Sequence, residues 1–215
     1  MDLLAALRAH RLVAIVRGDD PEAAARSVAV LAEEGVVLVE ISLSGAGALD
    51  AIAAARRELG PDALLGAGTV LTERDARDAR RAGASFAVTP GLSEGVTASV
   101  ALGMPVLAGV MTPTDVIAAV RMGAAGCKIF PAAQAGGPGY LRALRAPFPD
   151  VPFVPVGGVD APAAREYLAA GAVAVGVGSP LLGDAPSGGD LDALRGRASA
   201  FLGAVGAVTA GEERR

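Results

Sequence analysis

A chain of 215 residues, 52% hydrophobic but only 3% aromatic, is long enough for one large domain with a core of Ala, Val, Leu and Ile. The formal net charge of −4 excludes the basic surface that nucleic acids or anionic membranes require. One cysteine, Cys127, excludes an intramolecular disulfide, and one histidine, His10, argues against a multi-histidine metal site or a Ser/His/Asp triad. No metal or cofactor is expected, so the chemistry must use Lys, Glu, Arg, Thr, Ser and backbone groups.

Nothing in the sequence predicts a membrane protein. The N-terminus lacks a basic region followed by an apolar run and a cleavage site, and the apolar runs are short and broken by glycine or charge. We therefore expect a cytoplasmic protein, with residues 1–209 forming one domain and residues 210–215 a disordered tail.

Apolar segments alternate with helical ones along the whole chain. A short helix is expected over residues 2–10, and a closing helix over about residues 191–208. Eight apolar runs predict strands; they cover residues 12–17, 36–43, 64–70, 86–91, 105–111, 126–132, 153–159 and 173–179. Gly83, Gly103 and Gly123 each end a helix just before a strand, where a left-handed residue closes the helix.

Strands that are apolar throughout are typical of parallel sheets covered on both faces. Eight strand–helix units predict an α/β fold, a single (β/α)₈ TIM barrel with an N-terminal helix. An open doubly wound sheet is the alternative, although no GxGxxG fingerprint follows the first strand, which argues against a dinucleotide-binding version.

Lys128 is the residue most informative about chemistry. Of the 19 Lys and Arg residues it is the only lysine, and it lies between Cys127 and Ile129 in an apolar run. Desolvation favours the neutral amine, which can attack a carbonyl and form a Schiff base. A lysine that snorkels to the surface from a strand end is an equally good interpretation of this segment alone.

Two other charged residues belong to the expected strand ends. Glu40 interrupts an apolar run as Lys128 does, and it could act as a general acid/base beside the amine. A buried ion pair between the two is the structural alternative. Arg17 could bind a substrate carboxylate, or it could pair with Asp19 or Asp20 instead.

Glycine-rich turns follow the last two expected strands. Gly157 and Gly158 close one, and Gly178 with Ser179 closes the other. In barrel enzymes these two loops often hold a phosphate, because glycine lets backbone N–H groups approach the anion. Plain tight turns are the alternative. Together with the charged residues, the pattern favours a carbonyl substrate that carries a phosphate.

The motifs across nearly the whole chain have a familiar order. The sequence resembles the class I aldolases of the 2-keto-3-deoxy-6-phosphogluconate (KDPG) and 2-keto-3-deoxy-6-phosphogalactonate (KDPGal) family through VAIVRG, VEISLS, GAGTV, VTPGL, GVMTPTD, KIFPA, GPGYLRAL, PVGGV and VGVGS. The resemblance implies a (β/α)₈ barrel, a homotrimer without a metal, and reversible cleavage to pyruvate and glyceraldehyde 3-phosphate.

The resemblance also implies a role for each matching residue. Lys128 matches the Schiff-base lysine and Glu40 the general acid/base. The implied substrate-binding residues are Arg17 and Thr69 at the pyruvate carboxylate, Pro90 and Phe130 at the pyruvyl methyl, and Gly157, Gly158, Gly178 and Ser179 at the phosphate.

Two positions depart from parts of that family. Ser44 stands where some members have an arginine, which leaves the carboxylate contact to Arg17. Val156 stands where KDPG-preferring members often have threonine. The missing hydroxyl favours the galactonate epimer or loose selectivity between epimers.

Three rival functions are compatible with a barrel of this kind. A metal-dependent epimerase of the same shape would need several histidines. A silent binding protein would not need both Lys128 and Glu40. A 4-hydroxy-2-oxoglutarate aldolase, giving pyruvate and glyoxylate, would use the same two residues and leave the phosphate loops idle.

Overall fold

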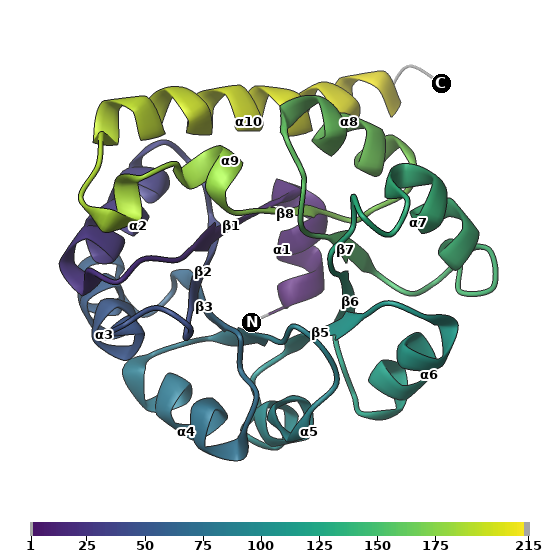
Figure 1. The fold of residues 1–215 in the computed structure, drawn as a ribbon, viewed down its shortest axis with the longest axis horizontal. Coiled ribbons are helices and arrows are strands. Elements are labelled where there is room, and N and C mark those ends of the chain that lie inside the picture. Colours follow the sequence, from purple (N-terminus) through teal and green to yellow (C-terminus); the bar gives the residue numbers. More distant parts are fainter. Residues whose placement is uncertain (1, 213–215) are drawn as a thin grey trace.

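The computed structural model describes residues 2–212, with only the backbone course given for residues 207–212. It is an eight-stranded barrel inside a ring of helices (Figure 1). The strands are β1 (Leu12–Val16), β2 (Leu38–Ser42), β3 (Leu64–Gly68), β4 (Phe86–Val88), β5 (Val106–Val110), β6 (Gly126–Ile129), β7 (Phe153–Pro155) and β8 (Val175–Val177). The helices are α1 (Leu3–His10), α2 (Pro21–Glu33), α3 (Ala48–Leu59), α4 (Glu73–Ala82), α5 (Glu94–Ala101), α6 (Pro113–Arg121), α7 (Gly137–Arg145), α8 (Ala161–Ala169), α9 (Ser179–Leu182) and α10 (Leu191–Glu212), with a 3₁₀ turn at Ala185–Ser187.

All strand pairs are parallel, and they follow the order of the chain from β1 to β7. Strand β8 pairs with β1, and an isolated parallel bridge between Val156 and Gly176 joins β7 to β8 and closes the ring. The expectation of a TIM barrel is therefore confirmed.

The strands are buried on both faces, as their uniformly apolar sequences predict. One large cluster fills the layer between the strands and the outer helices, and it includes Val39, Ile52 and Leu65. A smaller cluster fills the barrel interior, where Val13, Phe86 and further inward residues pack together. Alternate residues of each strand thus serve two separate cores.

Helix α1 closes one end of the barrel. Asp2 caps its first turn by accepting a hydrogen bond from the backbone N–H of Ala5. Leu3 and Leu7 are almost completely buried and belong to the interior cluster. Figure 1 shows α1 lying across the centre of the barrel. The amino-terminal mouth is therefore stoppered, and the carboxyl ends of the strands form the open mouth.

The structure corrects two boundaries. The strands end earlier than expected, at Ile129 rather than 132 in β6 and at Val177 rather than 179 in β8, because the residues beyond those ends form loops at the open mouth. Helix α10 is described through Glu212, and residues 213–215 lie outside the described range, so the tail expected over residues 210–215 stays a prediction.

Candidate active site

Lys128 lies inside the barrel near its open mouth. It is the third residue of β6, its neighbours in register are Gly109 on β5 and Val154 on β7, and it is only 7% exposed. Its Nζ lies 5.4 Å from the centre of the Phe130 ring, within the range of a cation–π contact. The interpretation of a lysine that snorkels to the surface is therefore wrong.

Glu40 lies on β2, four strands away from β6 in the barrel, and its side chain also faces the interior. It pairs in register with Ile15 on β1 and Gly66 on β3, and it is 3% exposed. Burial raises the pKa of the Glu40 carboxyl above its usual value, and the positive charges of Lys128 and Arg17 partly oppose that rise. A carboxyl in this environment can hold a proton and release it again, as a general acid/base must.

The two buried charges do not touch. Among the described residues, no salt bridge joins Glu40 to Lys128. The two groups influence one another through space without a direct salt bridge. No contact ion pair is therefore observed between the amine and the carboxyl, although the charge of Lys128 still acts on the Glu40 carboxyl.

Arg17 follows β1 at the open mouth and is exposed. Asp19 and Asp20, the two aspartates that could have paired with Arg17, accept hydrogen bonds from backbone N–H groups instead. Asp20 caps α2 by accepting hydrogen bonds from the N–H groups of Glu22 and Ala23, and Asp19 accepts one from the N–H of Ala46. Within the described part of the chain Arg17 forms no ion pair, so its guanidinium is available to an anion.

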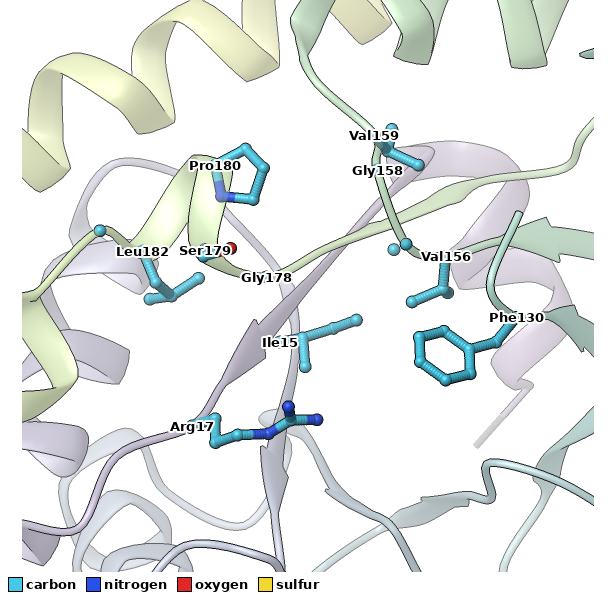
Figure 2. Close-up of a pocket in the computed structure, with 13 residues that line it drawn as sticks. Ile15, Arg17, Phe130, Val156, Gly158, Val159, Gly178, Ser179, Pro180 and Leu182 are labelled. Atoms are coloured by element: carbon cyan, nitrogen blue, oxygen red, sulfur yellow. The ribbon is translucent and has the colours of Figure 1, made fainter. Parts of the chain in front are cut away.

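A cavity of about 260 Å³ opens between the ends of β1, β6, β7 and β8. Figure 2 shows the Arg17 side chain and the Phe130 ring reaching into it from different sides, with Ile15 between them. The cavity is lined by Ile15, Arg17, Phe130, Val156, Gly157, Gly158, Val159, Gly176, Gly178, Ser179, Pro180, Leu182 and Gly183. All four expected phosphate-loop residues therefore line one pocket together with Arg17.

The loop glycines have a steric reason to be glycine. Gly157 and Gly158 have φ angles of 97° and 70°, which side chains rarely adopt. A Cβ on Gly157 would lie 3.2 Å from the Phe130 ring. The absence of side chains thus keeps the ring against the loop and exposes backbone to the cavity.

Pro90 and Thr69 lie outside this cavity. Pro90 lines a neighbouring space of about 280 Å³ that also includes Gly109 and Phe130, so Phe130 belongs to both. Thr69 lies at the end of β3, where its hydroxyl is 2.9 Å from that of Ser42. The Ser42 hydroxyl is in turn 2.9 Å from that of Ser44.

Seven residues that line this cavity were not predicted from the sequence as site residues: Ile15, Val156, Val159, Gly176, Pro180, Leu182 and Gly183. Ile15 precedes Arg17 by two positions, so period-two alternation could have placed it on the inner face. Pro180 and Leu182 belong to the short helix α9, which the sequence analysis merged into a turn. Ser42 was missed because a serine next to a strand end is common in any barrel.

No group of three or more His, Cys, Asp or Glu residues that could hold a metal ion occurs in the part of the chain that the structure describes. Among the described helices, none is both long and apolar enough to cross a bilayer. Cys127, on β6, is buried, and desolvation raises the pKa of its thiol to about 12, so it is not a thiolate nucleophile.

The fold and the site together define a barrel enzyme that handles a carbonyl compound with a buried amine and carboxyl. Comparison with known proteins gives the family. The model of the KDPG and KHG aldolase family matches residues 3–195. The chain belongs to this family, and it is accordingly an aldolase, a carbon–carbon lyase of the Schiff-base class.

Individual relatives agree with the family. A probable 2-dehydro-3-deoxy-6-phosphogalactonate aldolase of Rhizobium meliloti (strain 1021) is 37% identical over 204 residues, which is 94% of this chain and 94% of the relative. A solved structure described as native KDPGal has a TM-score of 0.85 at 34% identity and covers 92% of this chain and 95% of its own. A KDPG aldolase of Legionella pneumophila, with pyruvate captured at low pH as a covalent carbinolamine intermediate, has a TM-score of 0.79 at 31% identity, covering 95% and 97%.

Proposed function

We propose that this aldolase reversibly cleaves 2-keto-3-deoxy-6-phosphogluconate, or its galactonate epimer, to pyruvate and D-glyceraldehyde 3-phosphate. Lys128 is the Schiff-base residue and Glu40 is the general acid/base. The single observation that carries this proposal is the burial of an amine and a carboxyl in one barrel interior without a salt bridge between them, Lys128 at 7% and Glu40 at 3% exposure. Membership of the family supports it.

The proposed reaction starts with attack of the neutral Lys128 amine on the C2 carbonyl. Glu40 gives a proton to the carbonyl oxygen, which leaves as water, and an iminium remains. Glu40, directly or through a water, then takes the C4 hydroxyl proton while the C3–C4 bond breaks, and the iminium accepts the electron pair. The aldehyde departs, the enamine is protonated at C3, and water releases pyruvate from Lys128.

The rest of the site holds the two ends of the substrate. Arg17 and Thr69 bind the carboxylate, and Pro90 and Phe130 surround the pyruvyl methyl. The phosphate occupies the cavity of about 260 Å³, against Gly157, Gly158, Gly178 and Ser179. Their N–H groups and one hydroxyl are suited to an anion, and this supports a phosphorylated substrate over 4-hydroxy-2-oxoglutarate.

The galactonate epimer is the substrate that we favour of the two. Ile15 and Val156 line the cavity proposed for the phosphate end of the substrate, and both are apolar. Neither offers a hydrogen bond to the C4 hydroxyl, whose configuration distinguishes the epimers. Relatives named for either epimer are equally similar, at 37% identity, so the preference rests on these two side chains.

The test is borohydride trapping with pyruvate, read by intact mass and peptide mapping. We expect a reduced pyruvyl adduct on Lys128. Lys128→Arg keeps the positive charge but cannot form an imine, so it is the matched control and should give no adduct and no turnover. Since Lys128 is the only lysine, no other side chain can supply the amine. Folded wild-type protein that gains no adduct in excess pyruvate would exclude the proposal.

Substrate comparison separates the remaining alternatives. The purified enzyme is assayed with each phosphorylated epimer and with 4-hydroxy-2-oxoglutarate. We expect the highest kcat/KM for a phosphorylated epimer. A clear preference for 4-hydroxy-2-oxoglutarate would show that the glycine loops do not bind phosphate and would favour the glyoxylate-forming activity.

We also propose that the chain forms a homotrimer, as the family resemblance implies. Three large apolar side chains lie exposed on two neighbouring outer helices: Val100 on α5, 36% exposed, and Ile117 and Val120 on α6, 44% and 53% exposed. A Cβ at Gly123, just past α6, would lie 3.3 Å from Val100, so the C-terminal end of α6 lies beside this side chain. Burial of such a face between subunits supports assembly.

A further inference from the structure

Three hydroxyls form a chain at the ends of β2 and β3. The Ser42 Oγ lies 2.9 Å from Thr69 Oγ1 and 2.9 Å from Ser44 Oγ. Ser42 is 1% exposed, whereas Thr69 is half-buried and Ser44 is exposed. The chain thus runs from the barrel interior to the solvent, with Ser42 at its centre.

The backbone holds Thr69 in an unusual conformation. Its φ is 61°, one of only two positive values among the non-glycine residues that the structure describes. For a β-branched residue this region is strained. This backbone conformation directs the Thr69 side chain differently from an extended backbone, and its hydroxyl lies 2.9 Å from that of Ser42.

Proton counting shows what the chain can do. Three hydroxyls carry three protons and share two hydrogen bonds, so one proton remains for an acceptor outside the chain. If an anion accepts from Thr69, the protons align so that Ser44 donates to Ser42, Ser42 donates to Thr69, and Thr69 donates to the anion. Each bond then polarises the next.

The chain lies beside the proposed general acid/base. Ser42 follows Glu40 by two residues, so both side chains face the barrel interior. Gly68, the residue before Thr69, is close to the Glu40 carboxyl, since a Cβ at Gly68 would lie 2.6 Å from Oε1. In a 2-keto acid the carboxylate is bonded to the carbon that Lys128 attacks, so a carboxylate within reach of Glu40 also lies near Thr69.

We infer that Ser42 is a positioning residue that aims the Thr69 hydroxyl at the carboxylate of the bound 2-keto acid, with Ser44 as the outer end of the chain. This inference rests on the proposed Schiff-base aldolase function. The neutral hydroxyls give the carboxylate a further donor beside Arg17 without adding another positive charge near Lys128.

The experiment measures the pyruvate concentration that gives half-maximal inactivation by borohydride. Wild type, Ser42→Ala, Thr69→Val and the double variant form a double-mutant cycle. We expect Ser42→Ala to raise that concentration roughly tenfold, the size expected for loss of a hydrogen bond to a charged group. The limiting rate should change less than threefold. In the Thr69→Val background Ser42→Ala should have no further effect, because Ser42 acts only through Thr69.

Two variants control for structure. Ser42→Thr keeps a hydroxyl and should restore the wild-type half-saturation to within about threefold. If Ser42→Ala does not fold, as judged by thermal unfolding, Ser44→Ala replaces it in the same cycle and should show a smaller loss that also vanishes in Thr69→Val.

The outcomes separate the inference from the function. If wild-type protein is not trapped by pyruvate, the proposed function fails. If wild type is trapped and Ser42→Ala keeps the same half-saturation, or shifts it equally with and without Thr69→Val, the positioning role is wrong and the aldolase function stands.

Discussion

The carboxyl of Glu40 lies directly against the main chain of Gly68 on the neighbouring strand. A Cβ at Gly68 would lie 2.6 Å from Oε1 and 3.0 Å from the carboxyl carbon of Glu40. The lack of a side chain at Gly68 therefore leaves the space that the Glu40 carboxyl, the proposed acid/base, occupies in the barrel interior.

Gly68→Ala should lower activity without unfolding the protein. The φ of Gly68 is not positive, so alanine fits the backbone, and the new methyl must displace the carboxyl. We expect kcat to fall at least tenfold, a fraction of the roughly 10²–10⁴-fold that acid–base catalysis supplies. Steady-state kinetics and thermal unfolding measure the two effects separately.

The matched control is Gly196→Ala, in α10, where an added Cβ meets no other atom within 4 Å. It should keep full activity and gain roughly 0.5–1 kcal/mol of stability from helix propensity. Wild-type kcat in Gly68→Ala would show that the carboxyl position is not critical.

Glu40→Gln should change how stability depends on pH. Burial raises the pKa of Glu40 above its usual 4.5, so the native state keeps this proton at pH values where the unfolded chain has lost it. The contribution of protonated Glu40 to the free energy of unfolding of the wild type is therefore complete below about pH 4.5. It is lost as the pH rises through the pKa of the folded state. The glutamine amide of the variant does not titrate. The free energy of unfolding of the variant should therefore increase relative to that of the wild type as the pH rises.

Denaturant unfolding at about pH 4 and about pH 8 measures this difference. If the free energies of unfolding of variant and wild type differ by the same amount at both pH values, the raised pKa of Glu40 is contradicted. A variant that loses stability at both would instead favour a structural role for the charge, since removing one member of a compensating pair is destabilising. Turnover in the same preparations should fall by roughly 10²-fold or more.

Val156→Thr should shift epimer preference towards the gluconate. The substitution is nearly isosteric and adds a hydroxyl to the apolar wall beside Ile15. A hydrogen bond to the C4 hydroxyl of one epimer is worth up to about tenfold in kcat/KM. The ratio of kcat/KM for the two epimers is the measurement, with Val156→Ala as the control that removes bulk without adding a donor. An equal ratio in Val156→Thr and wild type would place epimer selection elsewhere in the site.

Ile117→Glu with Val120→Glu should dissociate the proposed trimer. The two side chains lie one helical turn apart on α6 and are 44% and 53% exposed, so glutamates there would be buried as charges in an interface. Sedimentation velocity should show monomers at concentrations where wild type sediments as a trimer. Val37→Glu, at a comparably exposed apolar site before β2, is the control and should leave the assembly intact.

The sequence predicted the fold from local patterns because each strand is apolar on both faces and each helix ends at a clear signal. Thr72 and Thr112, for instance, form capping boxes at the starts of α4 and α6. Buried charge also made Lys128 and Glu40 visible, since a lone lysine and a lone glutamate stand out in apolar runs.

The rest of the site depends on contacts between distant segments. Neither the contact of Glu40 with Gly68 nor the chain from Thr69 to Ser44 has a local pattern, because register between β2 and β3 creates both. The lack of a contact between Glu40 and Lys128 likewise depends on the width of the closed barrel. Sequence periodicity assigns a side chain to a face but cannot give its partner across the ring.

Helix α1 closes one end of the barrel, and this closure affects proton transfer in the proposed reaction. Leu3 and Leu7 are buried at the lower end of the barrel, so the interior faces solvent at the mouth that the substrate enters. A bound sugar acid therefore shields Glu40 from bulk solvent until the aldehyde departs. The proton that Glu40 takes from the C4 hydroxyl is then the nearest one for C3, so a single carboxyl can serve both proton transfers of the cleavage.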